Sequence, residues 1–160
     1  MTTASEKHAR QHATARRTAR LRAIQALFQM DIGGMGARRV IEEFKENRLG
    51  GGDDTGPQSE ADIALFETLV RGVVEFQIGI DKAISGHLAK NWRLERLDAT
   101  VRAILRVASY EIMHAPNTPI KVILDEYVDL AGDFFSGPEP GFVNGALEAL
   151  ARDTRQGELS

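Results

Sequence analysis

Arginines near the N-terminus are the side chains best suited to hold a ligand. Arg16, Arg17 and Arg20 stand at positions i, i+1 and i+4, so at least two of them share one face of a helix. Guanidinium groups bind phosphate through paired hydrogen bonds, and cations crowded near a helix N-terminus oppose the helix dipole. The cluster therefore favours a bound phosphate chain, with a solvated basic face as the alternative.

The charge of the chain is unevenly distributed. Residues 1–30 hold six basic residues and one acidic residue, a local charge of +5, which leaves −8 for the rest of a chain whose net charge is −3. A basic segment on an acidic body is typical of a protein that meets a polyanion along one edge. The acidity argues against a membrane-surface protein, and no apolar run is long enough to span a bilayer.

The histidines and cysteines do not predict a metal centre. His8 and His12 lie four residues apart and could share a helix face as metal ligands, but no third ligand of a suitable type stands near them. Cysteine is absent, which excludes thiolate ligands, disulfides and a cysteine nucleophile. We therefore expect no metal and no cofactor.

Four carboxylates recur at helical spacing and are the remaining candidates for catalysis. They are Asp125, Glu126, Asp129 and Asp133. Paired carboxylates can hold magnesium or transfer protons, but a solvated helix face is the simpler interpretation, and a patch facing a partner is the next. No Gly-x-Ser-x-Gly, His-Glu-x-x-His or Gly-x-Gly-x-x-Gly motif is present. We predict a protein that is not an enzyme.

The elements that carry these residues are predicted to be helices. Apolar residues repeat every three or four positions along most of the chain, which is typical of amphipathic helices. The first helix places Leu21, Ile24 and Phe28 on one face and stops at Gly33-Gly34. A second covers residues 37–48.

A glycine-rich stretch separates these helices from a long central one. Residues Gly50–Pro57 predict a flexible polar loop, because a phosphate-binding loop would need a preceding strand and a Gly-Lys-Ser/Thr ending. Ser59 and Asp62 then form a capping box. The helix that follows extends to Leu88, with a bend expected near Gly79.

The C-terminal half predicts three further helices. Asp98 is a candidate N-cap for the first, which ends at Pro116. Thr118 is expected to cap the next, with Pro119 at its first position. A final helix precedes a polar tail that is expected to fray from Arg152 onward. Together these elements predict an all-α fold, a compact bundle of about seven helices.

Four motifs, in the same order along the chain, resemble the NusB family of transcription antitermination factors. They are the arginine cluster at 16–20 with Ala23–Phe28, the segment Leu94–Leu97 with 103–112, Pro119–Val122 with Glu126 and Leu130-Ala131, and Phe142–Leu147. Any one of them alone is weak evidence. Their order over residues 16–150 makes the match specific.

The resemblance implies two packed helical subdomains and no catalysis. It implies binding to the single-stranded boxA element of nascent RNA, chiefly the leaders of ribosomal RNA operons. The expected partner is NusE, a small-subunit ribosomal protein that also acts in transcription. Together they would join a cytoplasmic RNA polymerase complex that resists termination.

Family roles can be assigned to individual residues through these motifs. The RNA side is expected at Arg16, Arg17, Arg20, Gln25, Phe28, Lys121, Phe142 and Asn144. Phe28 either stacks on a base or packs in the core. The surface for NusE is expected at Glu95, Arg96 and Val101, and Glu111 is expected to support the bundle through hydrogen bonds.

Some positions depart from the family pattern. Thr18 stands where a basic residue is common, which removes one expected phosphate contact. Asp125, Tyr127 and Phe135 stand where Asn, a small residue and Gly are common. These changes put the surface near Phe134 in doubt, and the Gly50–Pro57 stretch lies outside the pattern.

The chain is expected to form one main domain with a short segment at each end. We expect a flexible basic arm over residues 1–15, one helical domain over 16–152 and a polar tail over 153–160. One rival is a helical protein-interaction domain without RNA binding. The other is a ribosomal RNA cytosine methyltransferase, which a similar helical domain precedes, but no glycine-rich strand–helix unit follows here. A homodimer that buries the arginine face is a further hypothesis.

Overall fold

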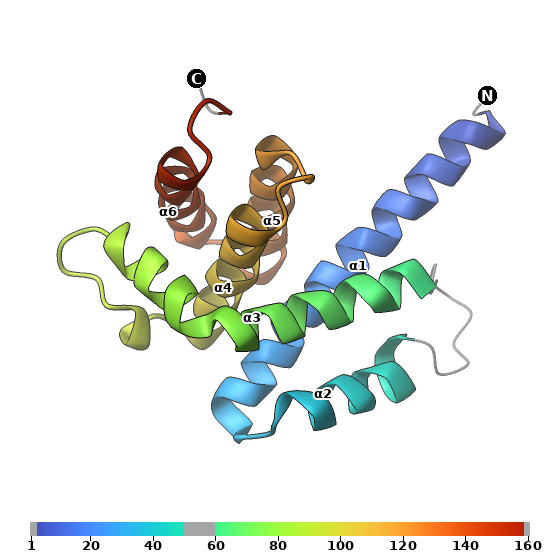
Figure 1. Ribbon diagram of the computed structural model, residues 1–160, viewed down its shortest axis with the longest axis horizontal. Helices are drawn as coiled ribbons and strands as arrows, with labels where there is room; N and C mark the ends of the chain where they lie inside the picture. The colour runs from blue at the N-terminus through green and yellow to red at the C-terminus, as the bar shows by residue number, and fades with distance from the viewer. Residues whose placement is uncertain (1–2, 50–59, 159–160) are drawn as a thin grey trace. The chain divides into compact units, whose positions relative to one another are not determined.

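The chain is helical throughout the part that the structure describes. The computed structural model describes residues 3–49 and 60–158, and within these ranges it contains helices and no strand (Figure 1). The α-helices are α1 (Ala4–Gly33), α2 (Ala37–Phe44), α3 (Glu60–Gly86), α4 (Ala99–His114), α5 (Ile120–Phe134) and α6 (Glu139–Thr154). A π-helical turn, η1 (Lys45–Leu49), and a 3-10 turn, η2 (Leu94–Arg96), complete the list. The all-α prediction is confirmed.

The chain divides into two compact units. The first extends to Arg71 and the second begins at Gly72, so the division falls inside α3. The boundaries predicted at residues 15 and 152 stay predictions. The Gly50–Pro57 stretch and the cap at Ser59 lie outside the described residues. No helix in the described ranges is long and apolar enough to cross a membrane.

In the first unit, α1 begins at Ala4. The Thr3 hydroxyl caps the helix by accepting a hydrogen bond from the amide of Glu6, and the residues of the first three turns are exposed. Burial starts at Ala15. The helix ends where the paired glycines predicted, because Gly34 adopts a left-handed φ of 70° that favours glycine.

Aromatic stacking joins α2 to the first part of α3, and an ion pair joins the start of η1 to it. The rings of Phe44 and Phe66 stack with centroids 5.5 Å apart, and both side chains are fully buried. Beside them Lys45 pairs with Glu67. The hydrogen bond from Lys45 lowers the pKa of the Glu67 carboxyl. This pair is partly exposed, so it contributes little to stability.

In the second unit, the bend of α3 lies at Phe76 and not at Gly79. Phe76 has φ −105° and ψ 18°, outside the helical region. Its ring stacks on His114 with centroids 4.1 Å apart, and Tyr110 stacks beside both. The prediction at Gly79 was wrong because packing of an aromatic ring against α4 sets the position of the bend.

Helices α4, α5 and α6 pack on one another and form the core of the second unit (Figure 1). Tyr127, fully buried, donates a hydrogen bond from its hydroxyl to the buried Glu111 carboxylate. This bond confirms the expected supporting role of Glu111. It also explains how a large residue at position 127 is accommodated, because the ring fills the core and the hydroxyl is paired.

Of the two helix caps predicted in the second unit, the one at Asp98 is confirmed and the one at Thr118 is wrong. Asp98 caps α4 as predicted, accepting from the amides of Thr100 and Val101. Thr118 does not cap α5, since Pro119 occupies the N-cap position and provides no side-chain acceptor. The amide of Ile120 donates instead to a carboxylate from beyond α6, which local sequence rules cannot predict.

His87 joins the end of α3 to the end of α6. Its Nδ1 lies 2.7 Å from the Ala83 carbonyl and its Nε2 lies 2.8 Å from Asp153 Oδ2. Only the protonated ring donates to both acceptors. The hydrogen bond to Ala83, followed by the interactions with Asp153, raises the pKa of His87.

Stability is therefore expected to fall as the pH rises past 6.5, the ordinary pKa of histidine, and through the raised pKa of His87. A raised pKa in the folded state gives stability that is complete below the unfolded pKa and is lost as pH rises through the folded one. The pair is partly exposed, so we expect a change of about 0.5 kcal/mol. Urea unfolding at several pH values measures it. His87→Gln should flatten the profile relative to His8→Gln, and an unchanged profile in His87→Gln contradicts the assignment.

Candidate nucleic-acid interface

The three arginines of α1 differ in how accessible they are. Arg16 and Arg17 are half-buried, whereas Arg20 is 2% exposed. Arg16 makes no hydrogen bond or ion pair within residues 3–49 and 60–158, whereas Arg17 and Arg20 both interact within the chain. Arg16 and Arg17 are therefore the more accessible cations of the cluster. The role of Arg20 in RNA binding stays a prediction.

The neighbouring positions of α1 are partly occupied by contacts within the helix. Arg22 Nη1 donates to Gln25 Oε1 at 2.8 Å, which uses one of the polar atoms expected to meet RNA. Phe28 is half-buried, so part of its ring is accessible and both roles considered for it stay predictions. Thr18 donates its hydroxyl to the Thr14 carbonyl, and the loss of a phosphate contact there stays a prediction.

The remaining predicted RNA residues lie in the second unit, at two separate places. Lys121 is exposed in the first turn of α5, and Phe142 and Asn144 lie near the start of α6. Because Arg155 at the end of α6 contacts the segment before α5, the two helices are antiparallel. At about 1.5 Å per residue, Lys121 lies about 20 Å from Phe142. The structure does not bring these residues into one small site.

The residues expected to face a partner also differ in exposure. Glu95 and Arg96 are exposed in η2. Val101 is 4% exposed in the first turn of α4, where packing explains its presence. Its role in partner binding stays a prediction, as do the roles of Glu95 and Arg96.

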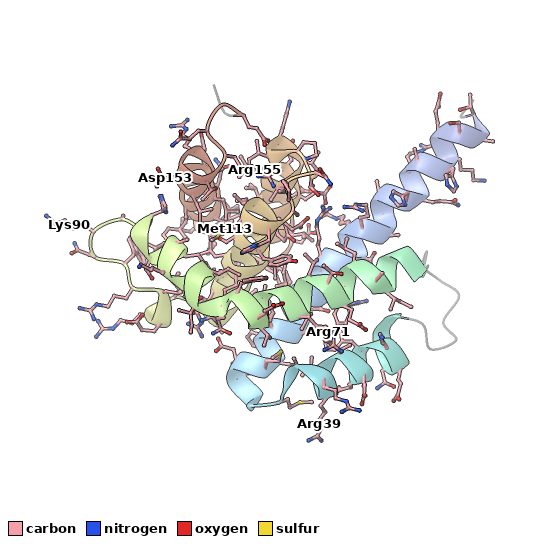
Figure 2. All side chains as sticks on the ribbon, viewed as in Figure 1. Arg39, Arg71, Lys90, Met113, Asp153 and Arg155 are labelled. Carbon is pink, nitrogen blue, oxygen red and sulfur yellow. The ribbon has the colours of Figure 1, made fainter. Side chains whose placement is uncertain are left out.

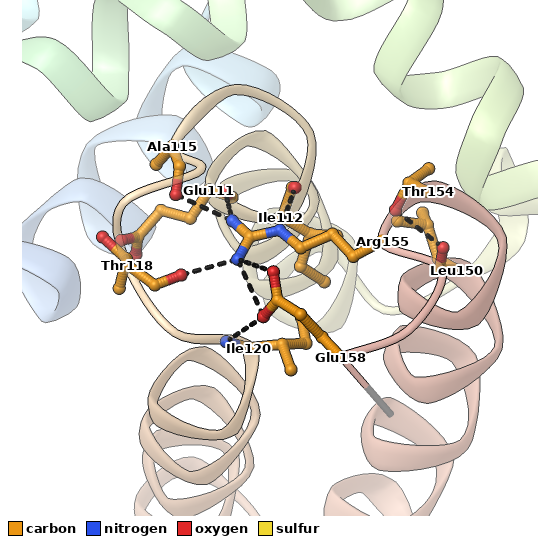
Figure 3. A network of polar contacts seen from close by, with 9 residues as sticks. All are labelled: Glu111, Ile112, Ala115, Thr118, Ile120, Leu150, Thr154, Arg155 and Glu158. Carbon is orange, nitrogen blue, oxygen red and sulfur yellow. Dashed lines mark hydrogen bonds and ion pairs between the residues drawn. The ribbon is translucent and has the colours of Figure 1, made fainter. Parts of the chain in front are cut away.

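Arg155 makes many contacts that the sequence did not predict (Figures 2 and 3). The chain was expected to fray from Arg152 onward, but α6 continues to Thr154 and Arg155 is only 8% exposed. Its guanidinium donates to four backbone carbonyls at 2.6–2.9 Å, those of Glu111, Ile112, Ala115 and Thr118. Glu111 and Ile112 belong to the last turn of α4 and Ala115 follows it, a place where the last helical carbonyls have few partners within the helix.

Glu158 completes this network from the same tail. Its carboxylate lies 3.4 Å from Arg155 Nη1 and accepts the amide hydrogen of Ile120 at the start of α5. Figure 3 shows both side chains reaching into the α4–α5 connection from beyond α6. The pair therefore fixes the connection that precedes Lys121. The expectation of a frayed tail was wrong for these two residues.

The described residues contain no metal-binding group. Among them no cluster of three or more histidine, aspartate or glutamate side chains could hold a metal ion. The acidic stripe of α5 is mostly at the surface, with Asp125, Asp129 and Asp133 exposed and Glu126 half-buried.

The comparisons with known proteins agree with the fold and the motifs. The NusB family model matches residues 17–152. A transcription antitermination protein NusB of Maricaulis maris is 50% identical, over 99% of this chain and 100% of that protein. Its counterpart in Caulobacter vibrioides is 49% identical, over 88% of this chain and 94% of that protein.

Two solved structures share the fold. The NusB of T. maritima superposes with a TM-score of 0.74 at 29% identity, covering 86% of this chain and 91% of that one. A structure of the antitermination factors NusB and NusE in complex with dsRNA superposes with a TM-score of 0.74 at 23% identity, covering 87% of this chain and 97% of that one.

Fold and motifs together define an all-α protein with a basic first helix, of the class that acts in transcription without catalysis. The chain belongs to the NusB family of transcription antitermination proteins. The family is non-enzymatic.

Proposed function

We propose that this protein binds single-stranded boxA RNA of ribosomal RNA operons together with NusE, and so helps RNA polymerase resist termination in the cytoplasm. The observation that carries the proposal is the pair Arg16 and Arg17, partly accessible on α1, with Arg16 making no hydrogen bond or ion pair inside the described part of the chain. A solved structure of the same fold holds NusB and NusE in complex with dsRNA, which supports a role with NusE and RNA.

In this mechanism the arginines hold the sugar–phosphate chain and other side chains read the bases. Phosphate contacts set the position of the RNA without selecting a sequence. Unpaired bases are recognised by stacking and by hydrogen bonds along their edges. Gln25, Phe28, Phe142 and Asn144 are the side chains proposed for that reading, and Lys121 supplies a further phosphate contact in the second unit.

Replacing Arg16 or Arg17 by alanine is expected to weaken RNA binding and to flatten its salt dependence. With about three phosphates neutralised, the slope of log affinity against log salt is expected near −2, and each lost contact should reduce it by about 0.7. Fluorescence anisotropy of a labelled boxA RNA across a salt series measures both quantities. A matched boxA duplex tests the preference for single strands.

Arg39→Ala is the matched control, because Arg39 is an exposed arginine of the same unit that points away from α2 (Figure 2). It should leave the affinity and the slope unchanged. Arg20→Ala should instead lower the unfolding temperature, since Arg20 is buried. If the Arg16 and Arg17 variants bind with the affinity and slope of the unmodified protein, α1 is not the RNA-binding helix.

The contribution of NusE is tested in the same assay. Two modules that hold one RNA raise each other's effective concentration, so added NusE should tighten binding to boxA. Binding to NusE with no binding to any RNA would support the rival function, a protein-interaction domain. Light scattering with and without RNA tests whether a homodimer covers α1.

A further inference from the structure

The side chain of Trp92 is more exposed than is usual for tryptophan. It is the only tryptophan of the chain and is 57% exposed, in the connection between α3 and η2. Its ring lies against Phe142, with centroids 5.3 Å apart and planes tilted by 53°. Tryptophan is usually largely buried, so an indole that keeps half its surface in water at the edge of a second aromatic ring offers a face for stacking.

The backbone around Trp92 is firmly held. The amides of Asn91 and Trp92 both donate to the Ala89 carbonyl at 3.0 Å. On the C-terminal side of Trp92, the side chains of Leu94 and Leu97 are buried and hold the connection against the core. The exposure of Trp92 is therefore built into a fixed connection, which lowers the entropy cost of binding a ligand there.

A guanidinium from α4 fixes the same connection. Arg102 Nη1 lies 2.9 Å from the Leu97 carbonyl oxygen and 3.3–3.4 Å from those of Glu95 and Leu94. These three carbonyls lie in η2 and just after it. The conformation of the connection is therefore held by the Arg102 side chain of α4 as well as by the backbone hydrogen bonds of its own turns.

The surroundings of Trp92 carry positive charge. Lys90, Arg93 and Arg96 are exposed, and Glu95 is the one acid among residues 89–97, which leaves a local charge of +2 on an acidic body. None of the three cations makes an ion pair within residues 3–49 and 60–158. Lys90 extends away from the ribbon at the tip of the connection (Figure 2).

We propose that Trp92, supported by Phe142, stacks on an unpaired base of the bound RNA, while Lys90 and Arg93 contact the adjoining phosphates. Base stacking on an aromatic side chain and cations along the backbone are the two components of single-strand binding. The proposal rests on the proposed function and assigns it a second contact region, distinct in sequence from α1. The flanking cations favour a polyanion over an apolar protein surface as the occupant.

Tryptophan fluorescence tests the stacking directly, because Trp92 is the only indole of the chain. Titration of the full-length protein with single-stranded boxA RNA should quench the emission, with a midpoint that coincides with the anisotropy curve. Inorganic polyphosphate, which has phosphates and no bases, should leave the emission largely unchanged. RNA binding without quenching, or equal quenching by polyphosphate, overturns the proposal.

Variants at position 92 measure the contribution of the ring. Trp92→Ala should weaken RNA binding about tenfold, the loss typical of one base–aromatic stack, and Trp92→Phe should restore most of it. Ile78→Ala is the control, because Ile78 is an apolar side chain of the same unit and is 89% exposed. Thermal unfolding of each variant separates loss of binding from loss of fold.

The outcomes distinguish this proposal from the one on which it rests. If Arg16→Ala weakens RNA binding and Trp92→Ala does not, the RNA-binding function stands and the stacking role falls. If Trp92→Ala weakens binding to NusE and leaves RNA binding intact, the connection is a protein interface and the stacking role also falls. If no RNA binds to the unmodified protein, with or without NusE, both proposals fail.

Discussion

Arg155→Met is expected to destabilise the protein by about 3 kcal/mol, which lowers the unfolding temperature by about 6–12 °C. The arginine fork satisfies four carbonyls at the junction of α4 and α5, and hydrogen bonds that involve a charged group are stronger than neutral ones. Methionine keeps the length of the side chain and removes all of these donors. The Glu111 and Ala115 carbonyls keep a backbone donor, but those of Ile112 and Thr118 lose their Arg155 donor, and an unpaired polar group at a buried or half-buried place is costly.

Arg152→Met is the matched control for this experiment. Arg152 lies three residues earlier, is exposed and pairs with Glu148 in a solvent-accessible ion pair. Its loss should change stability by about 0.5 kcal/mol or less. Arg155→Lys should recover little, because a lysine ammonium cannot reproduce the planar fork. Thermal unfolding followed by circular dichroism measures all three, and an Arg155→Met transition that matches that of Arg152→Met contradicts the role given to Arg155.

Gly72→Ala is expected to destabilise the protein by about 2 kcal/mol, although alanine favours a helix by about 1 kcal/mol relative to glycine. A methyl group at position 72 would overlap ring carbons Cε1 and Cζ of Tyr110. The ring would have to leave its stack with Phe76 and His114, and such overpacking outweighs the gain in helix propensity.

The sign of this effect should reverse when the ring is removed. In a Tyr110→Ala background the overlap disappears, so adding Gly72→Ala should stabilise the protein by up to about 1 kcal/mol. Gly79→Ala is a second comparison, because a methyl group at Gly79 meets nothing within 4 Å, and it should be neutral or stabilising in the unmodified protein. Urea unfolding of the double-mutant cycle measures the coupling. A destabilising Gly72→Ala in the Tyr110→Ala background would show that the clash is not the cause.

The candidate RNA surface is only partly predictable from residue types. The cluster of arginines and the charge asymmetry are enough to identify the first helix as the basic one. Neither indicates that Arg20 is buried while Arg16 and Arg17 are accessible. Helical spacing tells which residues share a face, but the packing around that face controls which side chains reach solvent.

Local features of this protein follow directly from the order of its residues. The helical repeats, the stop at Gly33-Gly34 and the cap at Asp98 depend on interactions within four residues, and the four ordered motifs identify the family. Packing between distant segments sets the bend at Phe76, the cap of Ile120 by Glu158, the burial of Arg155 and the placement of Trp92 on Phe142. Each of these depends on contacts between residues that lie about 35 to 50 positions apart. The local pattern of apolar residues cannot predict such a contact, because its energy comes from atoms that only folding brings together.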